Sequence, residues 1–313
     1  MQKYILIVAI MLSFNVNAAN TCGDDLDNNC WDCGKTAADN CTARLDGTKL
    51  TIEGDGYMAD YYTPSIGVSA RPEGAVERPW GNNITNLEIK DGIKSIGFWA
   101  FHGTKISEIN IPASVEEIRS GAFQGIIPLT NVNFAENSKL EIIGAGVFNA
   151  VPNLTEVNIP QSVKVLGANT FNLSGINSVV LNDAVFADDN NYEAGYFHGL
   201  NLIALSDVDN IYCSDAVREK CEEYFDQAKF WEKGVYYPIK EKATLNINNA
   251  DGTVDTYRYN ADGTVDTYRY GSDGTAAIYR DGKLKGYKGK RIFTIDEANA
   301  VAGKVNSVKI RYR

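Results

Sequence analysis

The chain has 313 residues, a formal net charge of −10 and 44% hydrophobic residues. This acidic balance argues against nucleic acid as a partner, because phosphates require a surface rich in Lys and Arg. The chain has only two histidines and no Gly-x-Ser-x-Gly, phosphate-loop or HExxH motif, so we expect no enzyme, no catalytic residue and no cofactor.

Residues 1–19 have the pattern of a secretory signal peptide. Lys3 supplies the positive charge, residues 4–14 the short apolar run, and Val16-Asn17-Ala18 a small-residue cleavage site. The apolar run is too short to span a bilayer, and no later stretch is long or apolar enough to form a transmembrane segment. We therefore expect an exported protein at the cell surface or outside the cell, with the periplasm as an alternative.

Six cysteines in an exported chain favour disulfide bonds over free thiols. They are Cys22, Cys30, Cys33, Cys41, Cys213 and Cys221. Proximity favours Cys22–Cys30 and Cys33–Cys41, although the connectivity of the first four stays open. The pair Cys30 and Cys33 also allows a redox motif or half a zinc site, but no βαβ pattern surrounds it and an oxidising compartment removes the thiolates that zinc needs. We expect no metal.

Residues 20–83 predict a small N-terminal cap that contains the first four cysteines. Within residues 41–56, two stretches of alternating polarity, 42–45 and 49–53, flank Asp46-Gly47, a strong tight-turn pair. This hairpin, its disulfides and Trp80 are expected to cover the apolar end of the repeat array that follows.

Residues 84–232 contain a repeated apolar register. The rows are Ile84-x-x-Leu87-x-Ile89, Ile106-x-x-Ile109-x-Ile111, Leu129-x-x-Val132-x-Phe134, Leu154-x-x-Val157-x-Ile159 and Ile176-x-x-Val179-x-Leu181. Row starts are 22, 23, 25 and 22 residues apart, and four rows end in a small or branched residue before Phe. This period predicts a short α/β leucine-rich-repeat solenoid with a parallel β-sheet, because one unit cannot bury its apolar face alone.

Several motifs give this region a family resemblance. Ile-Pro-x-Ser-Val occurs at 111–115 and 159–163, Ser-Ile-Gly at 95–97, and Ala-Phe recurs, after an Asn40–Gly56 segment and Pro79-Trp80-Gly81. Residues from about Cys33 to Trp231 thus resemble the BspA-type leucine-rich repeats of bacterial surface proteins. The resemblance implies an extracytoplasmic binding or adhesion protein without catalytic residues. Ala135–Ser138 replaces the Pro-x-Ser motif in the third row, so its back loop is expected to be irregular.

The residues between the apolar positions of each row are expected to face outward in two columns. The candidate binding face is made of Asn86, Glu88, Glu108, Asn110, Asn131, Asn133, Glu156 and Asn158, and the columns end at Ser178 and Val180. Because this face has no Trp, Tyr or Arg, it argues against a tight protein interface. Two alternatives remain, a ladder of stacked Asn side chains and a weak polar surface for a ligand such as a glycan.

The end of the solenoid is predicted from a helical stripe. Val217, Cys221, Tyr224, Phe225 and Ala228 recur at helical spacing within residues 214–229. We expect this helix to close the solenoid, pinned by Cys213–Cys221, so that the solenoid folds without the tail. The insertion 183–195 before it is interpreted as a solvated loop, and a last row begins at Leu202.

The remaining sequence predicts a different module. Residues 233–289 contain a linker and an eleven-residue repeat, identical at 249–259 and 260–270 and diverged at 271–281, in which Asp-Gly turns alternate with strands. The candidate aromatic ladder is Tyr257, Tyr259, Tyr268 and Tyr270. It is interpreted either as a spacer with packed tyrosines or as a carbohydrate-binding platform.

Residues 290–313 predict a strand, a short helix and a strand. The stretch from Ala276 to Arg313 holds ten basic and three acidic residues, so contact with an anionic envelope polymer is one interpretation and a small terminal fold the other. For the whole chain we expect a surface or secreted interaction protein whose partner is a host or neighbouring-cell surface protein or glycan. The alternative is a structural envelope component with no specific ligand.

Overall fold

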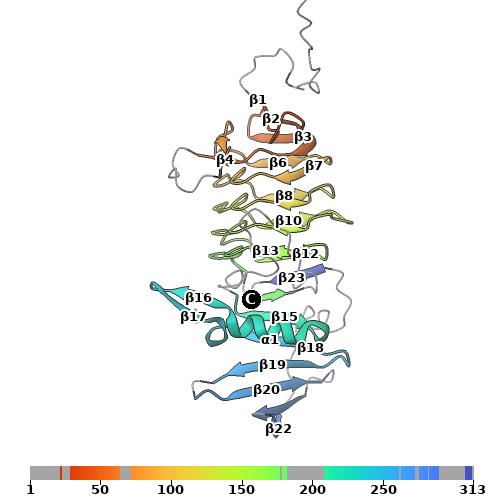
Figure 1. Cartoon of the computed structure of the whole chain (residues 1–313), viewed down its shortest axis with the longest axis vertical. Helices are drawn as coiled ribbons and strands as arrows, with labels where there is room; N and C mark the ends of the chain where they lie inside the picture. The colour runs from red at the N-terminus through yellow and green to blue at the C-terminus, as the bar shows by residue number, and fades with distance from the viewer. Residues whose placement is uncertain are drawn as a thin grey trace, which may run out of the picture.

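A computed structural model describes residues 22, 29–63, 72–176, 178–181, 208–260, 262–271, 275–280, 282–288 and 307–311. The expected signal peptide, the insertion at 183–195, the row at Leu202 and the first strand and helix of the C-terminal segment lie outside the described residues. In the part that is described, short strands stack along the long axis, from β1 at one end to β22 at the other (Figure 1). No helix in these ranges is long and apolar enough to cross a membrane.

The N-terminal cap is an antiparallel hairpin that continues into the repeats. Its strands are β1 (Cys30–Asp32), β2 (Asn40–Asp46) and β3 (Lys49–Tyr57), and the small strands β4 (Tyr61–Tyr62) and β5 (Val76–Glu77) lie beside it. Asp46 pairs with Lys49, so the central turn residues are Gly47 and Thr48, one position later than the expected Asp46-Gly47. Gly47 takes a φ of 58°, which glycine adopts without steric cost. Two disulfides, Cys22–Cys30 and Cys33–Cys41, hold the cap as proximity favoured.

Each repeat contributes two parallel strands. The first strands are β6 (Asn86–Ile89), β8 (Glu108–Ile111), β10 (Asn131–Phe134), β12 (Glu156–Pro160) and β14 (Ser178–Val180). The second strands are β7 (Ile93–Ile96), β9 (Glu117–Ile118), β11 (Ile142–Ile143) and β13 (Val165–Leu166), which form a second parallel ladder. Strand β3 pairs with β6 through its first half and with β7 through its second half, so the cap covers both strands of the first repeat.

The core contains a continuous column of aromatic rings. Phe101, Phe123, Phe148 and Phe171 are almost completely buried, and successive ring centroids lie 5.5, 6.0 and 6.1 Å apart. Each repeat places its Phe at the same turn, so each ring stacks on the ring of the next repeat. Trp80 extends the column to the cap, 6.1 Å from Phe101, and its Nε1 donates a hydrogen bond to the carbonyl oxygen of Ala100. The cap therefore covers the apolar end of the column.

The ladder of first strands is not continuous. Strand β6 pairs with β3 and not with β8, and the ladder is interrupted again on either side of β12. Strand β10 forms a ladder with β8, whereas β12 forms its ladder with β23 (Ser307–Arg311), which runs antiparallel between β12 and β14. The C-terminal strand therefore lies beside the middle of the solenoid, as Figure 1 shows. A pocket lies between β10 and β12.

The far end of the solenoid is a continuation of its sheet. The elements there are β15 (Asn210–Ser214), the 3-10 turn Asp215–Val217, α1 (Arg218–Gln227), β16 (Lys229–Glu232), β17 (Val235–Pro238), the 3-10 turn Ile239–Glu241, β18 (Thr244–Asn248), β19 (Val254–Tyr259), β20 (Val265–Tyr270), β21 (Ala276–Arg280) and β22 (Lys283–Lys288). Strand β18 pairs in parallel with β15, and β19 to β22 extend the same sheet in antiparallel order.

The expected helix forms and is linked to β15 by the Cys213–Cys221 disulfide, but it does not close the solenoid by itself. Leu245 and Ile247 of β18 are fully buried in the same core as the repeats. The expectation that the solenoid is independent of its tail is therefore not confirmed, because the sheet crosses the boundary expected at residue 232.

Candidate binding surface

The outward columns of the repeats lie where the sequence predicted. Asn86, Glu108, Asn110, Asn131, Asn133, Glu156 and Asn158 are exposed, and Glu88 is half-buried, while the alternate apolar residues point into the core. The parallel register pairs Asn131 with Glu108 and Asn133 with Asn110, so residues of one column are neighbours across strands. The face is polar over the first four rows.

Part of this face is a hydrogen-bonded ladder. The Asn133 amide donates to Asn110 Oδ1 at 3.0 Å and to Glu108 Oε1 at 2.9 Å, across the paired strands β8 and β10. In the described part of the chain no such bond joins Asn133 to Asn158 of the next row, because β10 and β12 do not form a ladder. The stacked-amide interpretation thus holds for rows two and three and ends at the pocket.

The first row is electrostatically tied to the cap. Glu88 forms an ion pair with Lys49 of β3 at 2.7 Å and a second with Lys90. The hydrogen bond from Lys49 and, to a smaller extent, the one from Lys90 lower the pKa of Glu88 to about 2. Glu88 therefore stays ionised at any physiological pH, and its charge is compensated within the protein.

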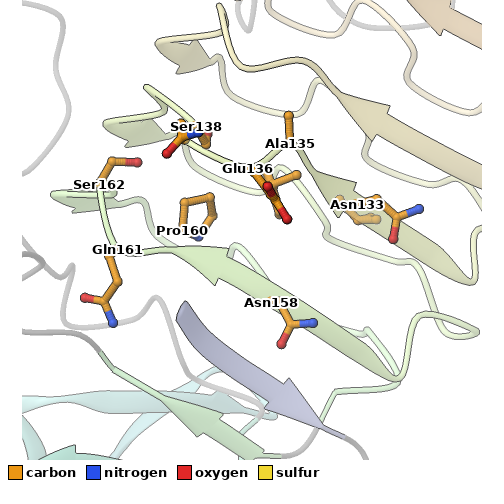
Figure 2. A pocket seen from close by; sticks show the side chains of 11 residues that line it. Asn133, Ala135, Glu136, Ser138, Asn158, Pro160, Gln161 and Ser162 are labelled. Carbon is orange, nitrogen blue, oxygen red and sulfur yellow. The ribbon is translucent and has the colours of Figure 1, made fainter. Parts of the chain in front are cut away.

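A pocket of about 590 Å³ opens between the third and fourth repeats. Figure 2 shows its walls, which come from the end of β10 and the loop after it on one side and from β12 and the following turn on the other. Its polar lining residues are Asn133, Glu136, Asn137, Ser138, Asn158, Gln161 and Ser162. Val132, Phe134 and Pro160 contribute apolar wall.

The pocket exists because the third repeat has a longer back loop. The segment from Phe134 to Leu140 is two residues longer than the equivalent Ile111–Val115, and Asn137 within it has a φ of 56°, in the left-handed region. The added residues move this loop out of line with its neighbours. The irregular third row predicted from its sequence is thereby confirmed.

Because of this displacement, a serine in the fourth repeat lacks the hydrogen bonds that its counterpart in the second repeat forms. In the second repeat, Ser114 Oγ accepts a hydrogen bond from Gly92 N–H at 2.9 Å and donates one to the carbonyl oxygen of Ile93 at 2.8 Å. Ser162 occupies the equivalent position of the fourth repeat, but its buried hydroxyl has no hydrogen-bond partner. Leaving a buried hydroxyl unpaired costs about 1–3 kcal/mol. A polar ligand group that forms a hydrogen bond with Ser162 would remove this cost.

The chemistry of the lining limits what the pocket can hold. Among the lining residues that the structure describes there is no Lys, Arg or His, and the one charged group is the exposed Glu136 carboxylate. Amides and hydroxyls both donate and accept hydrogen bonds, and a carboxylate accepts. The pocket is therefore suited to an uncharged ligand with several hydroxyl or amide groups and unsuited to a phosphate or sulfate.

The four tyrosines of the expected aromatic ladder lie on two faces. In the register of β19 and β20, Tyr257 pairs with Thr267 and Thr256 pairs with Tyr268, so Tyr257 and Tyr259 face one side of the sheet and Tyr268 and Tyr270 the other. The reason is the odd length of the eleven-residue repeat, because side chains alternate along a strand. The ladder as one aromatic surface is therefore wrong.

The tyrosines on the first face pack against the helix. The Tyr259 ring stacks on Phe225 with centroids 5.6 Å apart, and the Tyr257 hydroxyl accepts a hydrogen bond from Arg218 at 2.6 Å. On the second face, Tyr268 stacks with Tyr270 and has the Arg258 guanidinium 5.1 Å from its ring centroid. Each pair has a packing role.

Repeated ion pairs stabilise the same strands. Arg269 binds Asp255 with two hydrogen bonds of 2.6 and 2.7 Å, and Arg280 binds Asp266 in the same way at 2.6 and 2.8 Å. The sequence carries the signal for this contact, an Asp followed fourteen residues later by an Arg, but sequence reasoning missed it. Burial raises the pKa of Asp255, but the hydrogen bonds and charge of Arg269, together with Asn249 and Arg218, outweigh burial and hold this pKa below its ordinary value.

The two alternative interpretations of Cys30 and Cys33 do not fit the structure. The two residues belong to different disulfides, and the described residues contain no free cysteine. Nor is there, within the described ranges, a group of three or more His, Cys, Asp or Glu that could hold a metal ion.

Stacked repeats of 22 to 25 residues, a parallel sheet and a buried Phe column define a leucine-rich-repeat solenoid. Residues 80–192 match the model of the BspA type leucine rich repeat region in six copies. This part of the chain is a BspA-type leucine-rich-repeat region, and the resemblance stated from its motifs is confirmed.

Two solved structures are similar to the chain. A leucine-rich repeat protein from Eubacterium ventriosum aligns with a TM-score of 0.42 and 20% identity over 66% of this chain and 47% of that chain. The pneumococcal vaccine antigen PcpA aligns with a TM-score of 0.31 and 21% identity over 43% of this chain and 46% of that chain. The alignments therefore span about half the length of each of these structures. A comparison with curated proteins found no match.

Proposed function

We propose that this protein is an exported, non-catalytic interaction protein that binds a protein or glycan partner through the strand face of its repeats. The observation that carries the proposal is the polar face formed by the exposed residues of β6, β8, β10 and β12, within a BspA-type repeat region. Strands β8 and β10 pair in parallel and stack their outward side chains at a spacing of roughly 4.8 Å, which suits an extended ligand that meets neighbouring rows at once.

The N-terminal pattern of a secretory signal and the three disulfides support an extracytoplasmic location. The proposed location is the cell surface or the extracellular space, with the periplasm as the alternative. Contact of the basic C-terminal segment with an anionic envelope polymer belongs to the same proposal.

The experiment has two parts. Protease shaving of intact producing cells should remove the protein from the cells if it is exposed at their surface. Purified, fluorescently labelled residues 20–313 should then bind to neighbouring-species or host cells, and Glu108→Lys on the strand face should reduce that binding. Glu219→Lys on α1 is the matched control, because it makes the same change of charge at an exposed position away from the face.

A structural envelope component is the second candidate. The ladder from Asn133 to Asn110 and Glu108 favours it, because these outward side chains are used in contacts within the protein. Under this function the labelled protein would bind no cells, and both charge variants would behave alike.

A further inference from the structure

We propose that the pocket between the third and fourth repeats binds one uncharged sugar unit of a glycan. This inference rests on the proposed function and narrows its partner to a neutral saccharide. It starts from the strand face between β10 and β12, where a pocket of about 590 Å³ opens among the described residues. Ligand pockets typically enclose about 300–1,000 Å³, and a sugar ring with its neighbour falls in that range.

The polar lining matches the hydroxyl groups of a sugar. Asn158 and Gln161 each present an amide, which can donate to one hydroxyl and accept from another, whereas Asn133 offers only its oxygen because its amide N–H groups donate to Asn110 and Glu108. Glu136 can accept hydrogen bonds from two adjacent hydroxyls, and in Figure 2 it lies over the middle of the pocket, between Ser138 and Asn133. This combination of amides and one carboxylate recognises groups that both donate and accept.

The charge of the lining decides between neutral and acidic sugars. The described lining residues include no cationic side chain, and the Glu136 carboxylate would repel a sialic acid, a uronic acid or a sulfated sugar. The apolar contribution of Phe134 and Pro160 gives the C–H face of a sugar ring a surface to pack on. An uncharged hexose or N-acetylhexosamine satisfies both conditions.

The unpaired hydroxyl of Ser162 is an independent observation at the same place. Its counterpart Ser114 is fully paired with the backbone of the preceding repeat, whereas the displaced third-repeat loop leaves Ser162 without a partner. A ligand hydroxyl, directly or through a water molecule, restores the missing hydrogen bond. The longer loop therefore creates both the space and an unmet hydrogen-bonding group.

The test uses saturation-transfer NMR on residues 20–313 with methyl glucoside, methyl galactoside, methyl mannoside and N-acetylglucosamine, each alone. N-acetylneuraminic acid is the acidic comparison. We expect saturable transfer to at least one neutral sugar and none to the acidic one. Asn158→Ala and Glu136→Ala should each weaken the binding about ten-fold, as the loss of a ligand hydrogen bond predicts.

Asn131→Ala is the matched control, because Asn131 is an exposed amide on the same strand face but is not part of the pocket lining. It should leave sugar binding unchanged, and circular dichroism should show the same melting curve for all three variants. Absence of transfer to every neutral sugar, or equal transfer in wild type and both pocket variants, overturns the inference. If the protein still binds cells in that case, the proposed function stands and only the sugar assignment fails.

Discussion

The Phe column contributes more to stability than any outward side chain of the same repeats. Phe123 stacks between Phe101 and Phe148 with centroids 5.5 and 6.0 Å away and is completely buried. Asn110, in the same repeat, is exposed and accepts one hydrogen bond from Asn133. The two side chains belong to the same repeat, but Phe123 is buried in the core and Asn110 is exposed on the surface.

We predict that Phe123→Ala lowers the free energy of unfolding by about 3–5 kcal/mol, because a large cavity replaces a ring in a packed column. Asn110→Ala should cost less than about 1 kcal/mol, since it removes one solvent-exposed hydrogen bond. Thermal and urea unfolding of both variants measure the difference. Equal melting temperatures would contradict the repeat register.

Disulfide bonds link individual secondary-structure elements at the two ends of the repeat array. Cys33–Cys41 crosses the cap, and Cys213–Cys221 joins β15 to α1. All four sulfur-bearing side chains are buried within the core. Each bond therefore links an element that covers the core to a strand beneath it.

We predict that the double variant Cys213→Ala/Cys221→Ala melts at a lower temperature, with a loss of about 2–4 kcal/mol from the removed cross-link. Mass spectrometry after thiol labelling of the unreduced, denatured wild type should find no labelled cysteine. Two labelled cysteines in that sample would show that the assigned bonds are not formed in the protein.

The hairpin strands depend on ionised carboxylates. Hydrogen bonds from Arg280 hold the pKa of Asp266 below its ordinary value. Burial raises the pKa of Asp255, but Arg269, Asn249 and Arg218 together outweigh burial and lower it. A carboxyl whose pKa is lower in the folded state stabilises the fold above its unfolded pKa of about 4. That stabilisation is lost as the pH falls through the lowered folded value.

We therefore predict that the melting temperature declines from about pH 5 to about pH 2. Asp255→Asn/Asp266→Asn should melt lower at neutral pH and should decline less over the acidic range, because the groups that titrate there are gone. Glu219→Gln, an exposed carboxyl on α1, is the control and should follow the wild-type curve. An acid decline in the double variant that equals the wild-type decline would contradict the role of these pairs.

The molecule as a whole is one continuous stack in which repeats, helix and hairpin strands share a core. Ile211 of β15 and Leu245 of β18 are both buried in the cluster that contains the repeat residues. Phe225 of α1 is covered in turn by Tyr259 of β19. Removing the hairpin module would therefore uncover the core.

We predict that truncation after Lys242 destabilises the protein strongly, because it removes β18 and with it the buried Leu245 and Ile247. Truncation after Lys288 keeps β18 to β22 and is the matched control, which should retain a cooperative unfolding transition. Circular dichroism melting of the two truncated proteins and the full chain makes the comparison. A truncation after Lys242 that melts like the full chain would show that the solenoid is closed by α1 after all.

Local periodicity made much of the fold predictable. The rows beginning at Ile84, the hairpin around Gly47 and the helix at 218–227 all follow from which side chains must be buried in a strand, a turn or a helix. The strand-face residues were predictable for the same reason, because every second side chain of a half-buried strand faces outward. Short separations in the chain favoured the disulfide pairs that the structure has, although the sequence left the connectivity of the first four cysteines open.

Contacts between elements could not be predicted from the sequence in this way. The sequence showed that the third repeat was longer, but only the folded stack turns those two residues into a pocket and leaves Ser162 unpaired. The split of Tyr257 and Tyr268 onto opposite faces depends on how β19 and β20 align.

Side-chain alternation and the apolar period are properties of one strand, and they depend only on residues that are close together in the chain. Which edge a strand pairs with is decided by contacts between residues far apart in the chain. The sequence alone therefore determined the repeat class and the outward face. The tertiary structure alone decided that β18 continues the repeat sheet and that β23 lies between β12 and β14.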